Sequence, residues 1–104
     1  MAKKTNKEKA FYNWRAGAFH LNFPNGNYLS TTFAPCSYSD NYNQRFPVGE
    51  RLFVPMKSDT CEIMFDCPEK LKKKILKKYN EGDGDPVGYL SIKHWAEIVN
   101  LLSK

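Results

Sequence analysis

The sequence predicts a small α+β domain: a mainly antiparallel sheet of three or four strands, opened by an N-terminal hairpin, with two helices packed on one face. Three observations predict this fold. Residues 19–33 read as two strands and a turn, and residues 60–67 alternate apolar and polar side chains. Residues 69–79 and 92–103 carry apolar positions at helical spacing. The order β-β, loop, β, α, β, α is typical of helices covering one side of such a sheet.

Length and composition predict a single folded domain. The chain has 104 residues, of which 41% are hydrophobic and 14% aromatic. Residues 1–9 are basic and lack apolar periodicity, so we expect a flexible N-terminal arm followed by one domain over residues 10–104. No apolar run approaches the ~20 residues of a membrane span, and no secretory signal follows the basic start. Three cysteines suit reduced thiols. These features predict a cytoplasmic protein.

The hairpin is signalled by Asn25-Gly26, a dipeptide favoured in tight turns. A two-residue turn mixes apolar and polar side chains on both faces of the strand pair. A three-residue loop over residues 25–27 separates them, as a half-buried antiparallel pair requires. We therefore expect the longer loop, with Asn27 in the left-handed conformation. On the apolar face of this register, Phe23 pairs with Leu29, Leu21 with Thr31 and Phe19 with Phe33.

The remaining strands are shorter or less regular. Phe11 and Trp14 fit either one helical turn or an edge segment against the core, and residues 51–54 suggest a short strand ended by Pro55. Residues 60–67 predict a strand that turns Cys61, Ile63, Phe65 and Cys67 toward the core, and residues 87–90 predict a last short strand.

Two helices complete the fold. The first follows Pro68, a residue favoured at helix starts. The second follows Ser91, a good N-cap, and should be better buried because its apolar arc is broader. The apolar arcs contain Leu71, Ile75, Leu76 and Tyr79 in the first helix, and Ile92, Trp95, Ala96, Ile98, Val99 and Leu102 in the second.

The sequence offers little for a metal or for catalysis. Its cysteines and histidines lack metal-ligand spacing, and Cys61 and Cys67 would lie about 20 Å apart along one strand. No nucleophile-elbow, P-loop or dinucleotide-binding pattern is present. We expect no metal, no cofactor and no enzymatic activity.

The net charge of +5 is unevenly distributed. Residues 1–15 carry +4 and residues 69–78 carry +5, which leaves −4 for the rest of the chain. One arc of the first helix therefore attracts phosphates or an acidic protein surface; the alternative is an ordinary solvated helix face. The lysines of this arc are Lys70, Lys73, Lys74, Lys77 and Lys78.

The preferred contact surface is the long loop from Pro35 to Glu50. It combines tyrosine, asparagine, serine and arginine, a mixture typical of recognition surfaces. The alternative is that its aromatic residues only pin the loop to the body. The candidate partner-binding residues are Tyr38, Asp40, Asn41, Tyr42, Asn43 and Arg45.

Four segments occur in an order that resembles a class of small proteins encoded by tailed phages and prophages. They are FHLNFPNGNYLST, SYSDNY, CEIMFD and VGYLSIKHWAEIVNLL, and they span residues 19–102. The resemblance implies a small accessory protein made during infection in the bacterial cytosol. Many such proteins act by stoichiometric binding, including inhibitors of defence systems such as CRISPR effectors. It implies no catalytic residues.

Three functions follow as hypotheses. The first is a non-enzymatic binding protein whose loop, helped by the lysine arc, engages a host protein or ribonucleoprotein, most concretely a defence complex. The second is a nucleic-acid-binding accessory protein that uses the lysine arc and the N-terminal arm. The third is a protein that sequesters a nucleotide-like signal, with Arg45 or a lysine on its phosphate.

Overall fold

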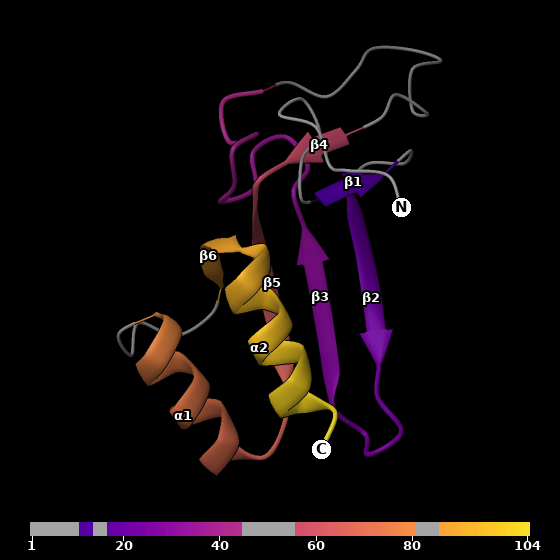
Figure 1. Ribbon diagram of the computed structural model, residues 1–104, viewed down its shortest axis with the longest axis vertical. Helices are drawn as coiled ribbons and strands as arrows, with labels where there is room; N and C mark the ends of the chain where they lie inside the picture. Colours follow the sequence, from indigo (N-terminus) through magenta and orange to yellow (C-terminus); the bar gives the residue numbers. More distant parts are fainter. Residues whose placement is uncertain (1–10, 14–16, 45–55, 81–85) are drawn as a thin grey trace, which may run out of the picture.

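The computed structural model describes residues 11–13, 17–44, 56–80 and 86–104 and confirms the α+β fold. A four-stranded antiparallel sheet has the order β2-β3-β5-β6. Helix α2 follows β6 directly, and α1 follows β5 after Cys67 and Pro68. Residues 33–44, after β3, lie at the end of the sheet where α2 begins (Figure 1). The elements are β2 (Ala18–Asn22), β3 (Tyr28–Thr32), β5 (Thr60–Asp66), α1 (Glu69–Tyr79), β6 (Val87–Ser91) and α2 (Ile92–Leu102).

A second, two-stranded sheet joins β1 (Phe11–Asn13) to β4 (Met56–Ser58). The strands are antiparallel, with Phe11 opposite Ser58. Phe11 is therefore in an edge segment rather than a helical turn, while β4 was not foreseen. The predicted arm over residues 1–9, Trp14 and the predicted strand over residues 51–54 lie outside the described residues.

The hairpin pairs β2 with β3 in a register two residues away from the predicted one. Leu21 lies opposite Leu29, and Phe19 lies opposite Thr31. The predicted pairing of Phe23 with Leu29 is therefore wrong, and residues 23–27 form the loop. Because a shift of two residues keeps every side chain on its face, the apolar and polar faces are those expected. The left-handed position belongs to Gly26, at φ +92°, rather than to Asn27.

The hairpin loop over residues 23–27 is stabilised by contacts with the C-terminus of α2. The Asn27 side chain is buried, and its Nδ2 donates to the Leu102 carbonyl oxygen at 2.8 Å. Asn25 Nδ2 donates to the carbonyl oxygens of Leu102 and Lys104, each at 2.8 Å. The last carbonyls of a helix lack partners within the helix. These asparagines supply such partners, so the loop conformation depends on a helix about 75 positions later in the chain.

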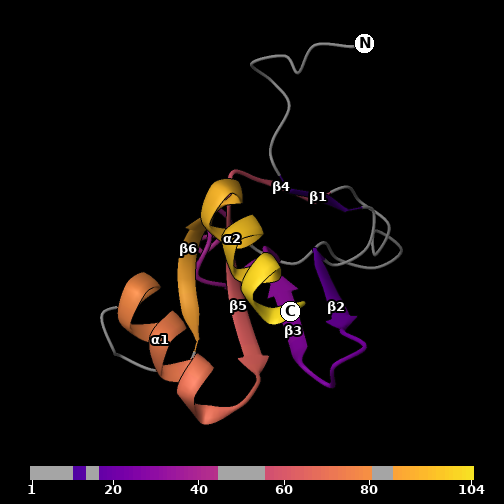
Figure 2. The same ribbon diagram turned by 60° about the horizontal axis from the view of Figure 1, so that its bottom comes forward.

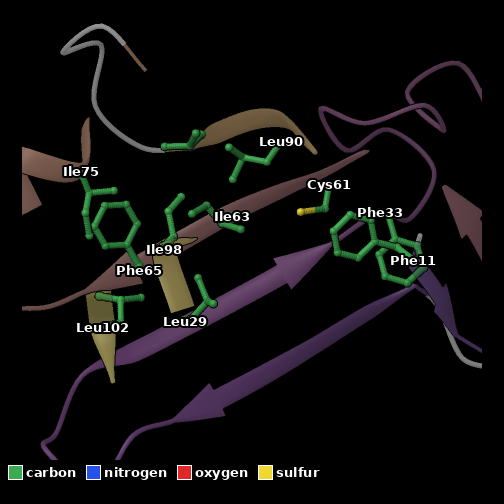
Figure 3. Packing of buried hydrophobic residues seen from close by; sticks show 11 residues of the cluster. Phe11, Leu29, Phe33, Cys61, Ile63, Phe65, Ile75, Leu90, Ile98 and Leu102 are labelled. Carbon is green, nitrogen blue, oxygen red and sulfur yellow. The ribbon is translucent and has the colours of Figure 1, made fainter. Parts of the chain in front are cut away.

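The core lies between the sheet and both helices. Cys61, Ile63 and Phe65 of β5 are buried and alternate with more exposed residues. Ile75 of α1 and Ile98 of α2 join them in one cluster (Figure 3). The two helices therefore cover the same face of the sheet, as Figure 2 also shows for α2 over β5. Phe11 and Phe33 extend this cluster at one end, their ring centroids 5.7 Å apart.

The opposite face of the four-stranded sheet is polar and more exposed. Met64, between the buried Ile63 and Phe65, is 52% exposed and pairs with Ser30 of β3. On the covered face, Trp95 Nε1 of α2 donates to Thr31 Oγ1 at 2.9 Å, which satisfies two polar groups. The sequence left open which face is exposed; the structure shows that it is the face that carries Met64.

Both helix starts agree with the sequence. Residue Pro68 precedes α1, and the Ser91 hydroxyl accepts the His94 N–H at 3.2 Å to cap α2. Helix α2 buries two residues and α1 buries one, so α2 is the better buried helix, as predicted. Its predicted apolar arc is too broad, however, because Ile92 is 43% exposed and Ala96 is also exposed. Neither helix of the described part is long and apolar enough to cross a membrane.

Candidate functional site: a tyrosine ladder

Three exposed tyrosine rings stack beside the end of the sheet. The rings of Tyr38 and Tyr42 have centroids 5.6 Å apart and an interplanar angle of 14°. Tyr89 of β6 stacks on Tyr38 at 6.5 Å and 30°. The side chains of Tyr38, Tyr42 and Tyr89 nevertheless remain 44%, 45% and 56% exposed. We call these three residues the tyrosine ladder. Exposed aromatic surface in a fixed arrangement is typical of contact surfaces.

Asp40 fixes the loop that carries two of these rings. Its Oδ2 accepts the Asp59 N–H at 2.9 Å, and its Oδ1 accepts the Thr60 hydroxyl at 2.8 Å. The Asp40 N–H in turn donates to Thr60 Oγ1 at 2.9 Å. This carboxylate, predicted as a partner contact, therefore ties the loop to the start of β5.

Asn41 fixes the loop on its other side. Its Nδ2 donates to the Phe33 carbonyl oxygen at 2.6 Å and to the Lys57 carbonyl oxygen at 3.0 Å. The buried hydroxyls of Ser37 and Ser39 lie 2.8 Å apart and are hydrogen bonded to each other. The loop is thus held by its own polar groups, and its tyrosine rings remain outside.

The backbone of Tyr38 is held by the sheet. Its N–H donates to Glu62 Oε1 at 2.8 Å, and its carbonyl oxygen accepts the Tyr89 N–H at 2.8 Å. Gly88 packs against it so closely that an added Cβ would lie 2.5 Å from Tyr38 Cβ. Real Cβ atoms do not approach this closely, so residue 88 must be glycine for the loop to dock here.

Tyr89 was not predicted as a site residue. It has φ +53°, in the left-handed region, and lies where the register between β5 and β6 shifts. Both features accompany a β-bulge, which redirects a side chain on an edge strand. The sequence contained one signal, because a glycine inside a strand pattern often marks a bulge or a close backbone approach. That glycine is Gly88, immediately before Tyr89.

Two further residues, Asn43 and Arg45, were predicted to contact a partner. Asn43 is exposed in the loop. Arg45 lies outside the described residues.

The predicted lysine arc is on the surface of α1. Lys70, Lys73, Lys74, Lys77 and Lys78 are all exposed. Lys72 is different: its Nζ donates to the Phe65 carbonyl oxygen at 3.3 Å and lies 5.4 Å from the Phe65 ring centroid. Helix α1 packs on the sheet face that carries the buried Cys61 and Ile63. Glu62, which holds Tyr38, points to the other face. The ladder and the lysine arc therefore lie on different faces of the molecule.

One titratable pair, Tyr79 and Glu97, links the two helices. Tyr79 of α1 donates its hydroxyl to Glu97 Oε1 of α2 at 2.6 Å. Partial burial and this bond raise the pKa of Tyr79 to about 12. The same bond, aided by neighbouring Lys78, lowers the pKa of Glu97. Across the neutral range the pair therefore keeps one proton on the phenol and a charged acceptor, linking the two helices.

The cysteines and histidines show no shared site. Burial raises the pKa of the Cys61 thiol to about 12, so this group is inert at neutral pH. Cys36 is exposed, and His20 is paired with the Tyr28 hydroxyl through Nδ1 at 2.8 Å. Within the part of the chain that the structure describes, no group of three or more metal-ligating side chains comes together.

Comparison with known proteins identified no relative of this chain. No protein-family model, curated protein or solved structure matches the chain. The tyrosine ladder and its surroundings are therefore the features of the molecule that suggest a function.

Proposed function

We propose that this chain is a non-enzymatic binding protein that engages a host macromolecule through the tyrosine ladder. The observation that carries the proposal is the combination of three exposed rings with a loop already fixed by its own hydrogen bonds. Tyrosine offers a large contact area with few rotatable bonds. Because the loop is ordered before binding, little conformational entropy is lost when the partner docks.

The concrete form of the proposal is a phage-encoded inhibitor of a bacterial defence complex, acting in the host cytosol. It is supported by the resemblance of residues 19–102 to small phage accessory proteins. A stoichiometric inhibitor requires an exposed contact surface rather than a catalytic group. The ladder supplies such a surface on a chain of 104 residues.

The test is affinity capture from bacterial lysate followed by native mass spectrometry. The wild-type chain should retain a stoichiometric protein or ribonucleoprotein. The double variant Tyr38→Ala, Tyr42→Ala should lose it, with affinity falling at least about tenfold, because a central interface tyrosine contributes roughly 1–2 kcal/mol or more.

The control is Met64→Ala, which removes another exposed apolar side chain, on β5 opposite Ser30 of β3. Its binding should match the wild type, and circular dichroism should show that all variants remain folded. Undiminished capture by the folded double variant would overturn the proposal.

A second candidate is nucleic-acid binding by the lysine arc, favoured by the exposure of all five ammonium groups on one helix. In that case the captured partner is DNA or RNA. Its affinity should fall steeply with salt, and replacing the five lysines with glutamine should release it while the ladder variant retains it. The nucleotide-sequestering alternative depends partly on Arg45, outside the described residues.

A further inference from the structure

Two fixed carboxylates accompany the loop that carries the tyrosine ladder. Asp40 lies two positions from both Tyr38 and Tyr42, and its carboxylate is fixed by two hydrogen bonds. Glu62 is fixed against the ladder because it accepts the Tyr38 N–H. Residues 38–42 and 57–62 together carry three acidic side chains and one lysine, a local charge of −2 on a chain of net charge +5. The ladder is therefore an acidic aromatic surface on a basic protein.

This chemistry suits an arginine side chain. A guanidinium is planar and stacks on a tyrosine face, where the ring quadrupole attracts a cation. It also donates a fork of N–H groups that matches a carboxylate. Asp40 retains capacity for such a contact, because each of its oxygens accepts one bond and a carboxylate offers about four acceptor positions.

The same charges disfavour a nucleic acid at the ladder. Proteins that bind single strands by stacking place aromatic rings among cationic side chains, which track the phosphates. Here the carboxylate of Asp40 is fixed within the loop and that of Glu62 is bonded to the Tyr38 N–H, and both repel phosphates. The exposed lysines of α1 lie on the other face of the sheet. Charge complementarity therefore favours a basic protein surface as the occupant.

We propose that the tyrosine ladder, with Asp40 and Glu62, is a binding site for arginine side chains on the surface of a protein partner. This inference rests on the proposed function and specifies the chemistry of the partner's contact. A protein that binds nucleic acids presents such arginines on its own working surface, so occupation by this ladder would block that surface.

The test is an NMR titration of the full ¹⁵N-labelled chain with a short blocked peptide of alternating glycine and arginine. Amide shifts should concentrate at residues 38–42, 62 and 88–90. The matching lysine peptide should bind more weakly, because its ammonium lacks the planar fork. The matching glutamate peptide should leave the ladder unshifted. Because the chain has net charge +5, general attraction does not favour a cationic peptide.

Two charge-neutralising variants sharpen the result. Glu62→Gln keeps a side-chain oxygen for the Tyr38 N–H. Asp40→Asn keeps an oxygen for the Asp59 N–H and places an amide N–H where it can donate to Thr60 Oγ1. Each should weaken the arginine peptide roughly threefold, and Tyr38→Ala should abolish the ladder shifts. Met64→Ala, which removes an exposed side chain elsewhere on the open face, should bind like the wild type.

Opposite outcomes separate the two proposals. The arginine site would be overturned if the glutamate peptide or a DNA oligonucleotide shifted the ladder amides as much as the arginine peptide does. It would also be overturned if the arginine peptide did not shift these amides. If partner capture still depends on Tyr38 and Tyr42 in that case, the proposed binding function stands and only its partner chemistry is wrong. If capture ignores both tyrosines, the binding function itself fails.

Discussion

Replacing Gly88 with alanine should displace the tyrosine loop while the four-stranded sheet stays folded. The new methyl group would lie 2.5 Å from Tyr38 Cβ, so the loop must move away from β6. That movement breaks the bond between the Tyr89 N–H and the Tyr38 carbonyl oxygen. We expect a loss of about 1–3 kcal/mol in the free energy of unfolding, as for other overpacked contacts. Urea denaturation measures it.

The steric clash between a side chain at position 88 and Tyr38 can be tested by removing the Tyr38 side chain. Tyr38→Gly deletes the Cβ that Gly88→Ala would meet, so the two changes together should cost less than the sum of their separate costs. Additive costs across this double-mutant cycle would show that the loop does not dock on Gly88. The NMR signals of Tyr42 provide an independent readout. Tyr38→Gly removes the ring that stacks on Tyr42, and Gly88→Ala displaces it, so both single variants should shift these signals.

Truncating Ile63 should be far more damaging than truncating its neighbour Met64. Ile63 is fully buried between the sheet and the helices, and Ile63→Ala should cost about 2–5 kcal/mol through lost burial and the cavity left behind. Met64 is 52% exposed on the open face, so Met64→Ala should cost less than about 0.5 kcal/mol. Thermal or urea unfolding of both variants measures the difference.

This pair of residues tests which face of the sheet is covered. The two side chains are adjacent in β5 and similar in size, and they differ in the face to which they point. Similar losses for both variants would mean that the Met64 face is also buried, and the description of the open face would then be wrong.

The elements with strong local patterns were predicted from the sequence. Strand β5 alternates buried and exposed residues as its sequence does, because one face packs against the helices. Ser91 caps α2 through its own hydroxyl, an interaction within three residues. Both predictions depend on chemistry close in the chain.

Features that depend on distant contacts were missed. The register of the hairpin differs from the predicted one, and Asn25 and Asn27 in its loop bond to the end of α2, contacts that no local rule reveals. The position of β4 depends on pairing with β1, more than forty residues earlier. Tyr89 joins the ladder only because a bulge in β6 turns it toward Tyr38.

The candidate loop divides into two kinds of residue that its composition did not distinguish. Tyr38 and Tyr42 are exposed, as a contact surface requires. Asn41 instead bonds to the backbone of Phe33 and Lys57 and holds the loop in place. The loop is therefore held by a polar side chain rather than by Tyr38 and Tyr42, and the contact role of these two rings stays a prediction.

Chemical footprinting of the captured complex tests directly whether the tyrosine ladder is the contact surface. Tyrosine nitration is mapped by mass spectrometry on the free chain and on the complex. We expect Tyr38, Tyr42 and Tyr89 to lose reactivity in the complex. Tyr28, on β3 and bonded to His20, should react equally in both. If the three ladder tyrosines remain as reactive in the complex as in the free chain, the ladder is not the contact surface.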